Sequence, residues 1–198
     1  MSIADQKAAQ RLAARERRRH ARAAAGDRGH EHFTGLLLEQ ATVMGIEAGA
    51  VVAGYWAMAD EIDVIPAMTA LRDSFGVTCA LPVVVRNGAP LLFRAWQPGD
   101  QLDSGGFGTH HPQAGAPEVT PDVLLVPLLA FDKDGYRMGW GGGFYDRTLE
   151  QLRKNNGAVI AVGVAYAGQA FDAVVRDGYD QPMDWIVTEQ SIRKVGIR

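Results

Sequence analysis

The sequence predicts an α/β fold in which helices cover both faces of a mainly parallel sheet, giving three layers in the order α/β/α. Short apolar runs rich in Val, Leu and Ile alternate with helical segments, which is the pattern of parallel strands joined by crossover helices. The length of 198 residues suits one well-cored unit, so we expect residues 1–198 to form a single domain. A composition of 47% hydrophobic and 22% charged residues is that of a globular protein.

Four helices are predicted from residues that favour, start or stop a helix. Strong helix formers fill the N-terminal segment until Gly26 stops it. Pro66 falls in the first turn of a later helix, where its missing N–H is not needed, and Gly157 is expected to end the last helix. The predicted helices are 3–25, 31–44, a stretch within 60–75, and 144–154.

Apolar runs between these helices are predicted as strands. Asn87 and Gly88 form a hairpin signal between two of the runs. Residues 97–121 are rich in Gly, Pro and His and lack periodicity, so they are expected to form a long loop with a functional role. The predicted strands are 50–57, 77–85, 91–96, 122–131, 158–166 and 184–189.

Composition also bears on where the protein works. No apolar run reaches the roughly 18 residues of a membrane span, and no apolar core of a secretory signal follows the charged N-terminus. The one cysteine, Cys79, lies in an apolar run and is interpreted as a packed core thiol rather than a catalytic one. We therefore expect a cytoplasmic protein with no membrane partner.

Basic residues gather at the N-terminus. Residues 1–28 hold eight Lys or Arg and three Asp or Glu, a net charge of +5, whereas the whole chain carries −3. Some of them recur at spacings of three and four residues, which places them on one face of the predicted helix. This basic stripe is either a solvated face or a contact with an anion. Nucleic acid is not expected as a partner, because no RNP, KH or zinc-finger pattern accompanies the stripe. Its members are Lys7, Arg11, Arg15, Arg18 and Arg22.

The segment GYRMGWGGGFYDR, residues 135–147, follows the most apolar predicted strand and leads into a helix. Three consecutive glycines at 141–143 indicate a loop whose backbone takes positive φ or approaches another group closely. Backbone N–H groups at a helix start hold phosphate well, and Arg137 could pair with two oxygens. Neither the P-loop nor the dinucleotide-binding spacing is present. A phosphate-binding loop is nevertheless favoured over a plain tight turn.

Acidic and histidine residues leave several alternatives open. Asp146 is equally compatible with a carboxylate placed against the helix dipole and with a Mg²⁺ ligand shared with Asp180. Glu61 is more simply a solvated residue at a helix start than a group that binds a ligand. His110 and His111 are not expected to bind zinc, because adjacent histidines point apart and no further ligand lies at a suitable spacing.

On these residues the chain resembles the 5-formyltetrahydrofolate cyclo-ligase family, also called methenyltetrahydrofolate synthetases, nearly end to end. The stretch VPLLAFDKDGYRMGWGGGFYDR carries the resemblance, and Lys7 with Arg11, DEID, ALPVV, GGFG and VTE support it. The family implies a fold like that of the ribose-5-phosphate isomerase and CoA-transferase group. It also implies a ligase that uses Mg²⁺ and ATP to convert 5-formyltetrahydrofolate, with or without a polyglutamate tail, to 5,10-methenyltetrahydrofolate, ADP and phosphate.

The resemblance implies a role for each matching position. The positions implied to be catalytic are Arg137, Gly141, Gly142, Gly143 and Asp146. ATP is implied to lie on Lys7, Arg11, Arg137, Met138, Gly139, Trp140, Gly141, Gly142, Gly143, Phe144 and Tyr145. The folate is implied to contact Trp56, Glu61, Trp140, Gly141, Gly142, Gly143 and Phe144. Mg²⁺ is implied to bind Asp146 and Asp180, with Asp184 as the alternative to Asp180.

Some positions depart from the family pattern. Gln10 stands where Leu is usual, His111 replaces an acidic or amide residue before Pro112, and Tyr179 precedes Asp180 where His is common. His111 is given no role for this reason, and Asp180 is less secure than the first metal position. The alternative function is a protein that binds folate or nucleotide without turnover, although the retained glycines and basic residues argue against it.

Overall fold

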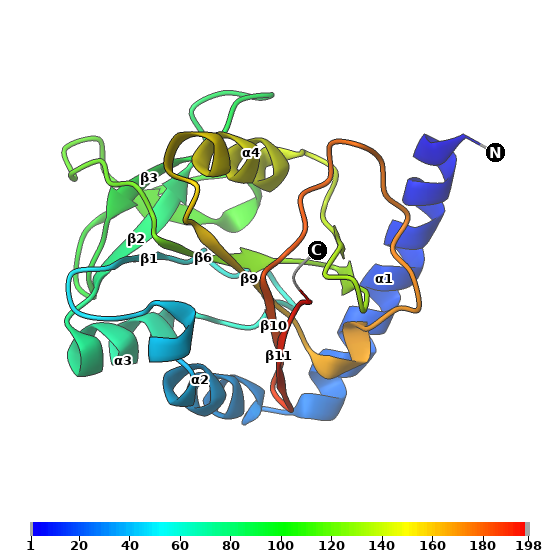
Figure 1. Ribbon diagram of the computed structural model, residues 1–198, viewed down its shortest axis with the longest axis horizontal. Helices are drawn as coiled ribbons and strands as arrows, with labels where there is room; N and C mark the ends of the chain where they lie inside the picture. Colours follow the sequence, from blue (N-terminus) through cyan, green and yellow to red (C-terminus); the bar gives the residue numbers. More distant parts are fainter. Residues whose placement is uncertain (1, 197–198) are drawn as a thin grey trace.

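The computed structural model describes residues 2–196 and contains a seven-stranded sheet in the order β11-β10-β9-β6-β1-β2-β3 (Figure 1). The five inner strands are parallel to one another, and each edge strand is antiparallel to its neighbour. The strands are β1 (Val51–Ala53), β2 (Thr78–Val83), β3 (Leu92–Ala95), β6 (Val123–Pro127), β9 (Ile160–Val164), β10 (Trp185–Val187) and β11 (Ile192–Lys194).

Helices lie on both faces of this sheet. Helix α4 (Phe144–Asn156) covers one face, whereas α2 (Gly29–Glu39) and α3 (Ile65–Phe75) pack together on the other (Figure 1). Helix α1 (Ile3–Ala25) lies beside the sheet and packs on the short 3-10 helix η3 (Ala167–Gln169). The prediction of three α/β/α layers around a mainly parallel sheet is confirmed. None of the helices within residues 2–196 combines the length and the apolar character needed to cross a membrane.

The helix limits follow the stop signals of the sequence. The predicted helices 3–25 and 144–154 are confirmed, the latter with two further residues, and the third helix is confined to α3. The predicted helix 31–44 was wrong as one element. It is α2 followed by a 3-10 turn, η1 (Thr42–Met44), which ends at Gly45 with φ +73°. The β-branched pair at 42–43 disfavours a continuous α-helix.

The predicted strand 50–57 is much shorter in the structure, because β1 ends at Ala53. Gly54 lies so close to α3 that a Cβ on it would be 2.2 Å from the Sδ of Met68. The chain therefore leaves the sheet directly after this close contact. Residues 54–57 lie outside the sheet but are buried or half-buried, so they are apolar like strand residues. The predicted strand was too long for this reason.

The predicted strand 122–131 is also divided. Strand β6 ends at Pro127, which has no N–H to continue the ladder. The carbonyls of Leu128 and Leu129 instead accept hydrogen bonds from the Nε2 of Gln169 at 2.8 and 3.1 Å. These bonds turn the chain away from the sheet.

A small hairpin follows, in which β7 (Ala130–Phe131) pairs with β8 (Arg137–Met138). The buried carboxylate of Asp132 shapes its turn, since Oδ1 accepts the backbone N–H groups of Asp134 and Tyr136, both at 3.0 Å. No periodic pattern in the sequence predicted β8, which has two residues. The turn fixes Arg137 at the start of the glycine-rich segment.

The predicted loop 97–121 contains a hairpin, in which β4 (Leu102–Ser104) pairs with β5 (His110–Pro112) around the 3-10 turn η2 (Gly106–Gly108). Each of these strands has three residues, too few for periodicity to register. The edge strand β11 escaped prediction for the same reason.

Strand order places one crevice at the carboxyl end of the sheet. β1 lies between β2 and β6, and the chain proceeds to β2 on one side and to β9 and β10 on the other. Ligands of α/β proteins bind at such a reversal of strand order. The loop after β1 carries Trp56 and Glu61, and the chain after β6 leads to the glycine-rich segment. The two candidate halves of a site thus leave adjacent strands.

Cys79 is a core residue in β2, with 1% of its surface exposed. Burial raises the pKa of its thiol to about 11, and its Sγ donates to the carbonyl of Met68 at 3.2 Å. The interpretation of Cys79 as a packed thiol is confirmed.

Candidate functional site

Residues Gly139–Gly143, here called the glycine loop, connect β8 to α4. Gly141 has φ +102° and Gly143 has φ +64°, values that residues with a side chain rarely adopt. A Cβ on Gly141 would also lie 3.3 Å from the Cζ of Arg11. Glycine is therefore required at these positions, because the backbone has positive φ and because α1 lies close. These two reasons explain part of the run of three glycines.

The loop ends at the N-terminus of α4, with Gly143 as the N-cap. This cap has no side chain, so none satisfies the first N–H groups of the helix. Exposed N–H groups at a helix start attract anions. Arg147, one turn further on, donates to the Gly142 carbonyl and lies with its Cζ 5.5 Å from the ring centroid of Phe144.

Two members of the basic stripe on α1 face the site. Arg11 donates from Nε to the Gly139 carbonyl at 3.1 Å, and Arg18 is 3% exposed and lies deepest. Arg15 is exposed, although its Cζ lies 4.7 Å from the ring centroid of Trp140. Of the two alternatives left open by the sequence, a solvated face is therefore wrong for Arg11 and Arg18 but holds for Arg15.

Lys7 is the first residue of the basic stripe, and two carboxylates bind its side chain. Its Nζ lies 2.9 Å from Asp177 and 2.6 Å from Asp180. Burial lowers the pKa of Lys7, but the hydrogen bonds that its Nζ donates to Asp180 and Asp177, together with the charges of these carboxylates, outweigh burial and raise the pKa overall. Lys7 is therefore a full positive charge at neutral pH, and its partners are acids that an anionic ligand would have to replace.

Residues 171–183, here called the acidic segment, run alongside α1 (orange in Figure 1). Gln10 fixes the two together, since its Nε2 donates to the Ala173 carbonyl and its Oε1 accepts from the Val175 N–H, both at 2.8 Å. The departure of Gln10 from the family pattern thus has a structural consequence that the sequence did not disclose. A leucine could make neither bond.

Arg137 and Asp146 form a buried pair behind the glycine loop. Arg137 donates from Nη2 to Asp146 Oδ1 at 2.9 Å and from Nη1 to the Gln181 carbonyl at 2.7 Å. The Gln181 N–H also donates to Asp146 Oδ1, at 3.0 Å. The side chain of Arg137 is 4% exposed and that of Asp146 is 22% exposed. Arg137 is therefore engaged with protein groups rather than directed at open space.

The donor set around Asp146 fits a magnesium ion. Among residues 2–196, both hydrogen bonds that this carboxylate accepts end on Oδ1, so Oδ2 can serve a cation. Asp180 resembles Asp146 in that both of its hydrogen bonds, from Lys7 and from the Asp177 N–H, end on one oxygen, Oδ2. No cluster of three or more Asp, Glu, His or Cys able to hold a metal occurs in the described part of the chain. Mg²⁺ needs only one or two carboxylates when phosphates supply the other ligands.

Asp184, the alternative second metal position, already binds protein groups away from Asp146. Its Oδ2 pairs with Arg153 at 3.0 Å and accepts the Ala161 N–H at 2.7 Å. Arg153 lies two turns beyond Asp146 on α4, about 10 Å along the helix axis. Asp180 is therefore the better candidate of the two.

Glu61 forms the inner end of the row. Its Oε1 accepts from Arg18 Nη1 and from the indole Nε1 of Trp140, both at 3.2 Å, and its Oε2 accepts the Met58 N–H at 2.9 Å. Glu61 is 7% exposed, so the prediction of a solvated residue was wrong. Arg18 Nε is a buried donor that meets no acceptor within residues 2–196. A ligand acceptor reaching this point would find an N–H available.

Tyr145 connects this end of the site to Arg137. Burial raises the pKa of its hydroxyl, the negative charge of Glu61 raises it further, and Arg137 opposes them. The hydroxyl therefore stays protonated at neutral pH. Trp56 lies half-buried after β1, where its ring meets that of His110 edge-on at 4.9 Å between centroids. Met138 is a buried strand residue just before the loop.

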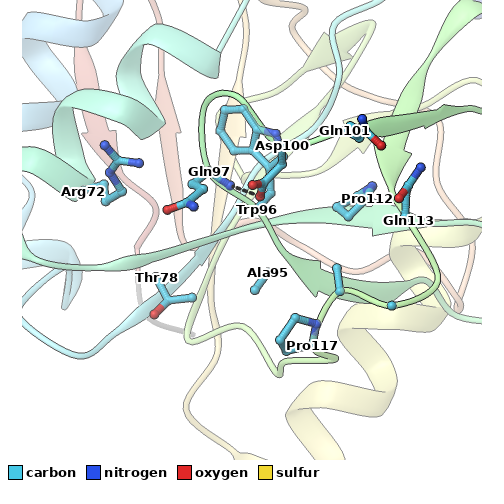
Figure 2. Close-up of a pocket in the computed structure, with 12 residues that line it drawn as sticks. Arg72, Thr78, Ala95, Trp96, Gln97, Asp100, Gln101, Pro112, Gln113 and Pro117 are labelled. Carbon is cyan, nitrogen blue, oxygen red and sulfur yellow. Dashed lines mark hydrogen bonds between the residues drawn. The ribbon is translucent and has the colours of Figure 1, made fainter.

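A separate cavity of about 470 Å³ lies at the other end of the sheet. Thr78 and Ala95, which line it, stand at the amino end of β2 and the paired end of β3 (Figure 2). Arg72, Gln97 and Asp100 contribute its polar side chains, with Asp100 accepting from the Gln97 N–H at 2.8 Å. No predicted site residue lines this cavity.

The structure thus brings the predicted residues together in pairs: Lys7 with Asp180, Arg11 with Gly139, Arg137 with Asp146, and Trp140 with Glu61. Sequence reasoning missed Arg18, Asp177, Gln181 and Gln10. The spacing of the basic stripe was the signal for Arg18. No local signal existed for the other three, whose partners lie far away in the sequence.

Asp177→Asn is expected to lower the KM for a nucleotide substrate by about two- to fivefold, because it removes one competitor for Lys7 at a partly exposed ion pair. Asparagine retains the Oδ1 that accepts the Tyr179 N–H. Initial rates against nucleotide concentration would measure the change, with Asp172→Asn as the control from the same segment. An unchanged or higher KM would show that Asp177 does not compete with the substrate.

Comparisons with known proteins agree with this fold and identify the family of the chain. Residues 3–189 match the model of the 5-formyltetrahydrofolate cyclo-ligase family. The chain is 39% identical to the 5-formyltetrahydrofolate cyclo-ligase of Haemophilus influenzae over 97 residues, covering 47% of this chain and about half, 51%, of that protein. It is 33% identical to the protein of the same name from Escherichia coli K12 over 146 residues, covering 71% and 79% of the two chains. The NMR structure of Aquifex aeolicus 5,10-methenyltetrahydrofolate synthetase superposes with a TM-score of 0.73 at 28% identity, covering 93% and 92%.

Proposed function

The chain belongs to the 5-formyltetrahydrofolate cyclo-ligase family of ligases, and we propose that it is a cytoplasmic enzyme converting 5-formyltetrahydrofolate to 5,10-methenyltetrahydrofolate. ATP is the proposed co-substrate, ADP and phosphate are the other products, and Mg²⁺ is the proposed metal. The observation that carries the proposal is the row of Lys7, Arg11 and Arg18 along the glycine loop, ending at Glu61.

This row has the length that the two substrates require. Lys7 and Arg18 are eleven residues apart on α1, about 16 Å along the helix axis. A triphosphate at the Lys7 end and a pterin at the Glu61 end would meet over the glycine loop. The buried carboxylate of Glu61 suits a ring that bears amino and ring N–H donors, and the loop and the α4 N-terminus suit phosphate.

The proposed reaction requires ATP at the Lys7 end and the folate at the Glu61 end at the same time. The formyl group is amide-like, so its oxygen leaves poorly until it is phosphorylated. The formyl oxygen attacks the γ-phosphorus of ATP, and the bond from that phosphorus to the ADP oxygen breaks. The neighbouring arylamine nitrogen then forms a bond to the formyl carbon, the C–O bond breaks, phosphate departs and the nitrogen gives up its proton. Because this nitrogen belongs to the same molecule, ring closure gains from high effective molarity.

The protein residues align the groups and balance their charge. Lys7 and Arg11 would hold phosphate oxygens. The glycine loop would let the formyl group approach the phosphates with no side chain between the two. Arg137 would fix Asp146, which with Asp180 would hold Mg²⁺ once Lys7 turns from Asp180 to phosphate. Bound Mg²⁺ would neutralise charge that develops on the phosphates.

Near-ultraviolet absorbance tests the proposal. Purified protein is mixed with 5-formyltetrahydrofolate, with and without Mg-ATP, and appearance of the methenyl product is followed. Growth of that band only with Mg-ATP supports the proposed reaction. A flat trace from folded protein that still binds ATP would overturn it in favour of a binding protein without turnover.

Lys7→Gln is expected to raise the KM for ATP by about ten- to a hundredfold, since one charge-assisted contact to phosphate is lost. Arg19→Gln, on the exposed side of the same helix, is the matched control. Initial rates over a range of ATP concentrations measure the effect. Equal KM values for the two variants would remove Lys7 from the ATP site.

A further inference from the structure

Trp140 already makes the contacts that the proposed folate would need at Glu61. Its indole Nε1 donates to Glu61 Oε1, and its ring lies 4.7 Å from the Cζ of Arg15 and 5.0 Å from that of Arg18. The indole is a planar aromatic heterocycle with one N–H donor. The pyrimidinone ring of a reduced pterin is also planar, and its amino group and ring N–H are donors, so both rings suit the same carboxylate.

Exposure distinguishes Trp140 from the other partners of Glu61. Glu61 and Arg18 are 7% and 3% exposed, whereas Trp140 is 42% exposed. The indole is therefore the outermost of the side chains that cover this carboxylate. Departure of the indole would leave Glu61 Oε1 with Arg18 Nη1 as its remaining partner, beside the Arg18 Nε that meets no acceptor within residues 2–196.

The backbone around Trp140 can accommodate such a departure. Gly139 and Gly141 flank it, a Cβ on Gly139 would meet nothing within 4 Å, and Gly141 takes a φ that suits glycine. Arg11 holds the Gly139 carbonyl and Arg147 holds the Gly142 carbonyl. The loop is thus anchored on both sides of Trp140, and rotation is confined to the two residues between, Trp140 and Gly141.

We propose that the Trp140 side chain is a gate at the pterin end of the site, which occupies Glu61 in the free protein and is displaced by the folate. The gate rests on the proposed function and adds to it a residue that sets folate affinity. A site whose competent state is only partly populated binds its ligand more weakly by that fraction. Trp140 thereby lowers the affinity for a folate and selects against rings that lack donors strong enough to displace an indole.

Trp140→Phe tests the gate, because phenylalanine keeps a ring on the arginines and removes the N–H. The KM for 5-formyltetrahydrofolate is expected to fall by about three- to tenfold, with a smaller change in kcat. A loop merely loosened by the substitution would show a higher KM and a lower kcat. Trp96→Phe, which alters an indole in the cavity at the other end of the sheet, is the matched control. A KM that is unchanged or higher in Trp140→Phe overturns the gate.

A second measurement uses the wild-type chain. Protein labelled with 5-fluorotryptophan carries four labelled side chains, and the ¹⁹F resonance missing from Trp140→Phe identifies Trp140. Addition of 5-formyltetrahydrofolate without ATP is expected to shift that resonance. A stationary Trp140 resonance in a protein that forms product overturns the gate alone. Absence of product together with four stationary resonances overturns the proposed function and the gate with it.

Discussion

Asp146→Asn is expected to lower kcat by about 10²- to 10³-fold and to move the Mg²⁺ titration to higher concentration. The magnitude is that of removing one group that stabilises charge in a transition state, about 3–4 kcal/mol. The structure gives two reasons: Oδ2 is placed to bind a cation, and Oδ1 holds Arg137 and the Gln181 N–H. Initial rates at saturating substrates across a Mg²⁺ series measure both effects.

Glu150→Gln is the matched control for Asp146→Asn. Glu150 lies on the same helix and pairs with Lys154 at the exposed surface. Thermal melting of both variants separates loss of chemistry from loss of fold, because an unbalanced Arg137 would also destabilise the protein. A rate within about threefold of wild type, with an unmoved Mg²⁺ titration, would leave Asp146 as a helix-start carboxylate favoured by the dipole.

Glu61→Ala is expected to have the largest effect on stability. It leaves the buried guanidinium of Arg18 without its carboxylate, a loss of about 3–5 kcal/mol for breaking a buried pair from one side. The KM for 5-formyltetrahydrofolate should rise about thirtyfold or more, whereas the KM for ATP should move little. Chemical denaturation and initial rates against each substrate measure these effects, with Asp60→Asn as the neighbouring control.

The double variant Glu61→Leu with Arg18→Met separates stability from binding. Replacing both members of a buried pair with apolar side chains is often neutral or stabilising, so much of the unfolding free energy should return. Folate affinity should not return, because the acceptor for the pterin is still missing. Recovery of both would mean that Glu61 serves only to neutralise Arg18, and that the pterin binds elsewhere.

Fold class was accessible from the sequence because alternation of apolar runs and helices is a property of long segments. Gly26 and Gly157 also gave sound helix limits, since a stop signal acts locally. The elements that were predicted wrongly or missed are short, or they depend on contacts with residues distant in the sequence. The close packing of Gly54 against Met68 joins residues 14 apart, and β11 is a strand only through β10.

The candidate site divides in the same way. Family resemblance implied roles for Glu61, Asp146 and the glycine loop, and it does so without a structure. It could not say that Arg11 and Arg18 face the glycine loop and Glu61, because periodicity determines which residues share a helix face but not what that face contacts. The contact of Trp140 with Glu61 joins positions 79 residues apart, and the sequence near either residue contains no pattern that predicts it.

The structure adds contacts to the residues that the resemblance singled out. Arg137, for which a phosphate contact was implied, donates to Asp146 and to the Gln181 carbonyl. Positive φ or a close approach was predicted for the three glycines. Gly141 and Gly143 have positive φ, and Gly141 also lies close to Arg11.

The clamp between Gln10 and the acidic segment bears on the order in which this protein is made. Gln10 lies 163 residues from Ala173, and Lys7 lies 173 residues from Asp180. During synthesis α1 is therefore made long before residues 171–183, which supply the partners of Lys7 and Gln10. The pair of Arg18 with Glu61 spans only 43 residues and can form much earlier. The pterin end of the proposed site is thus complete before its ATP end.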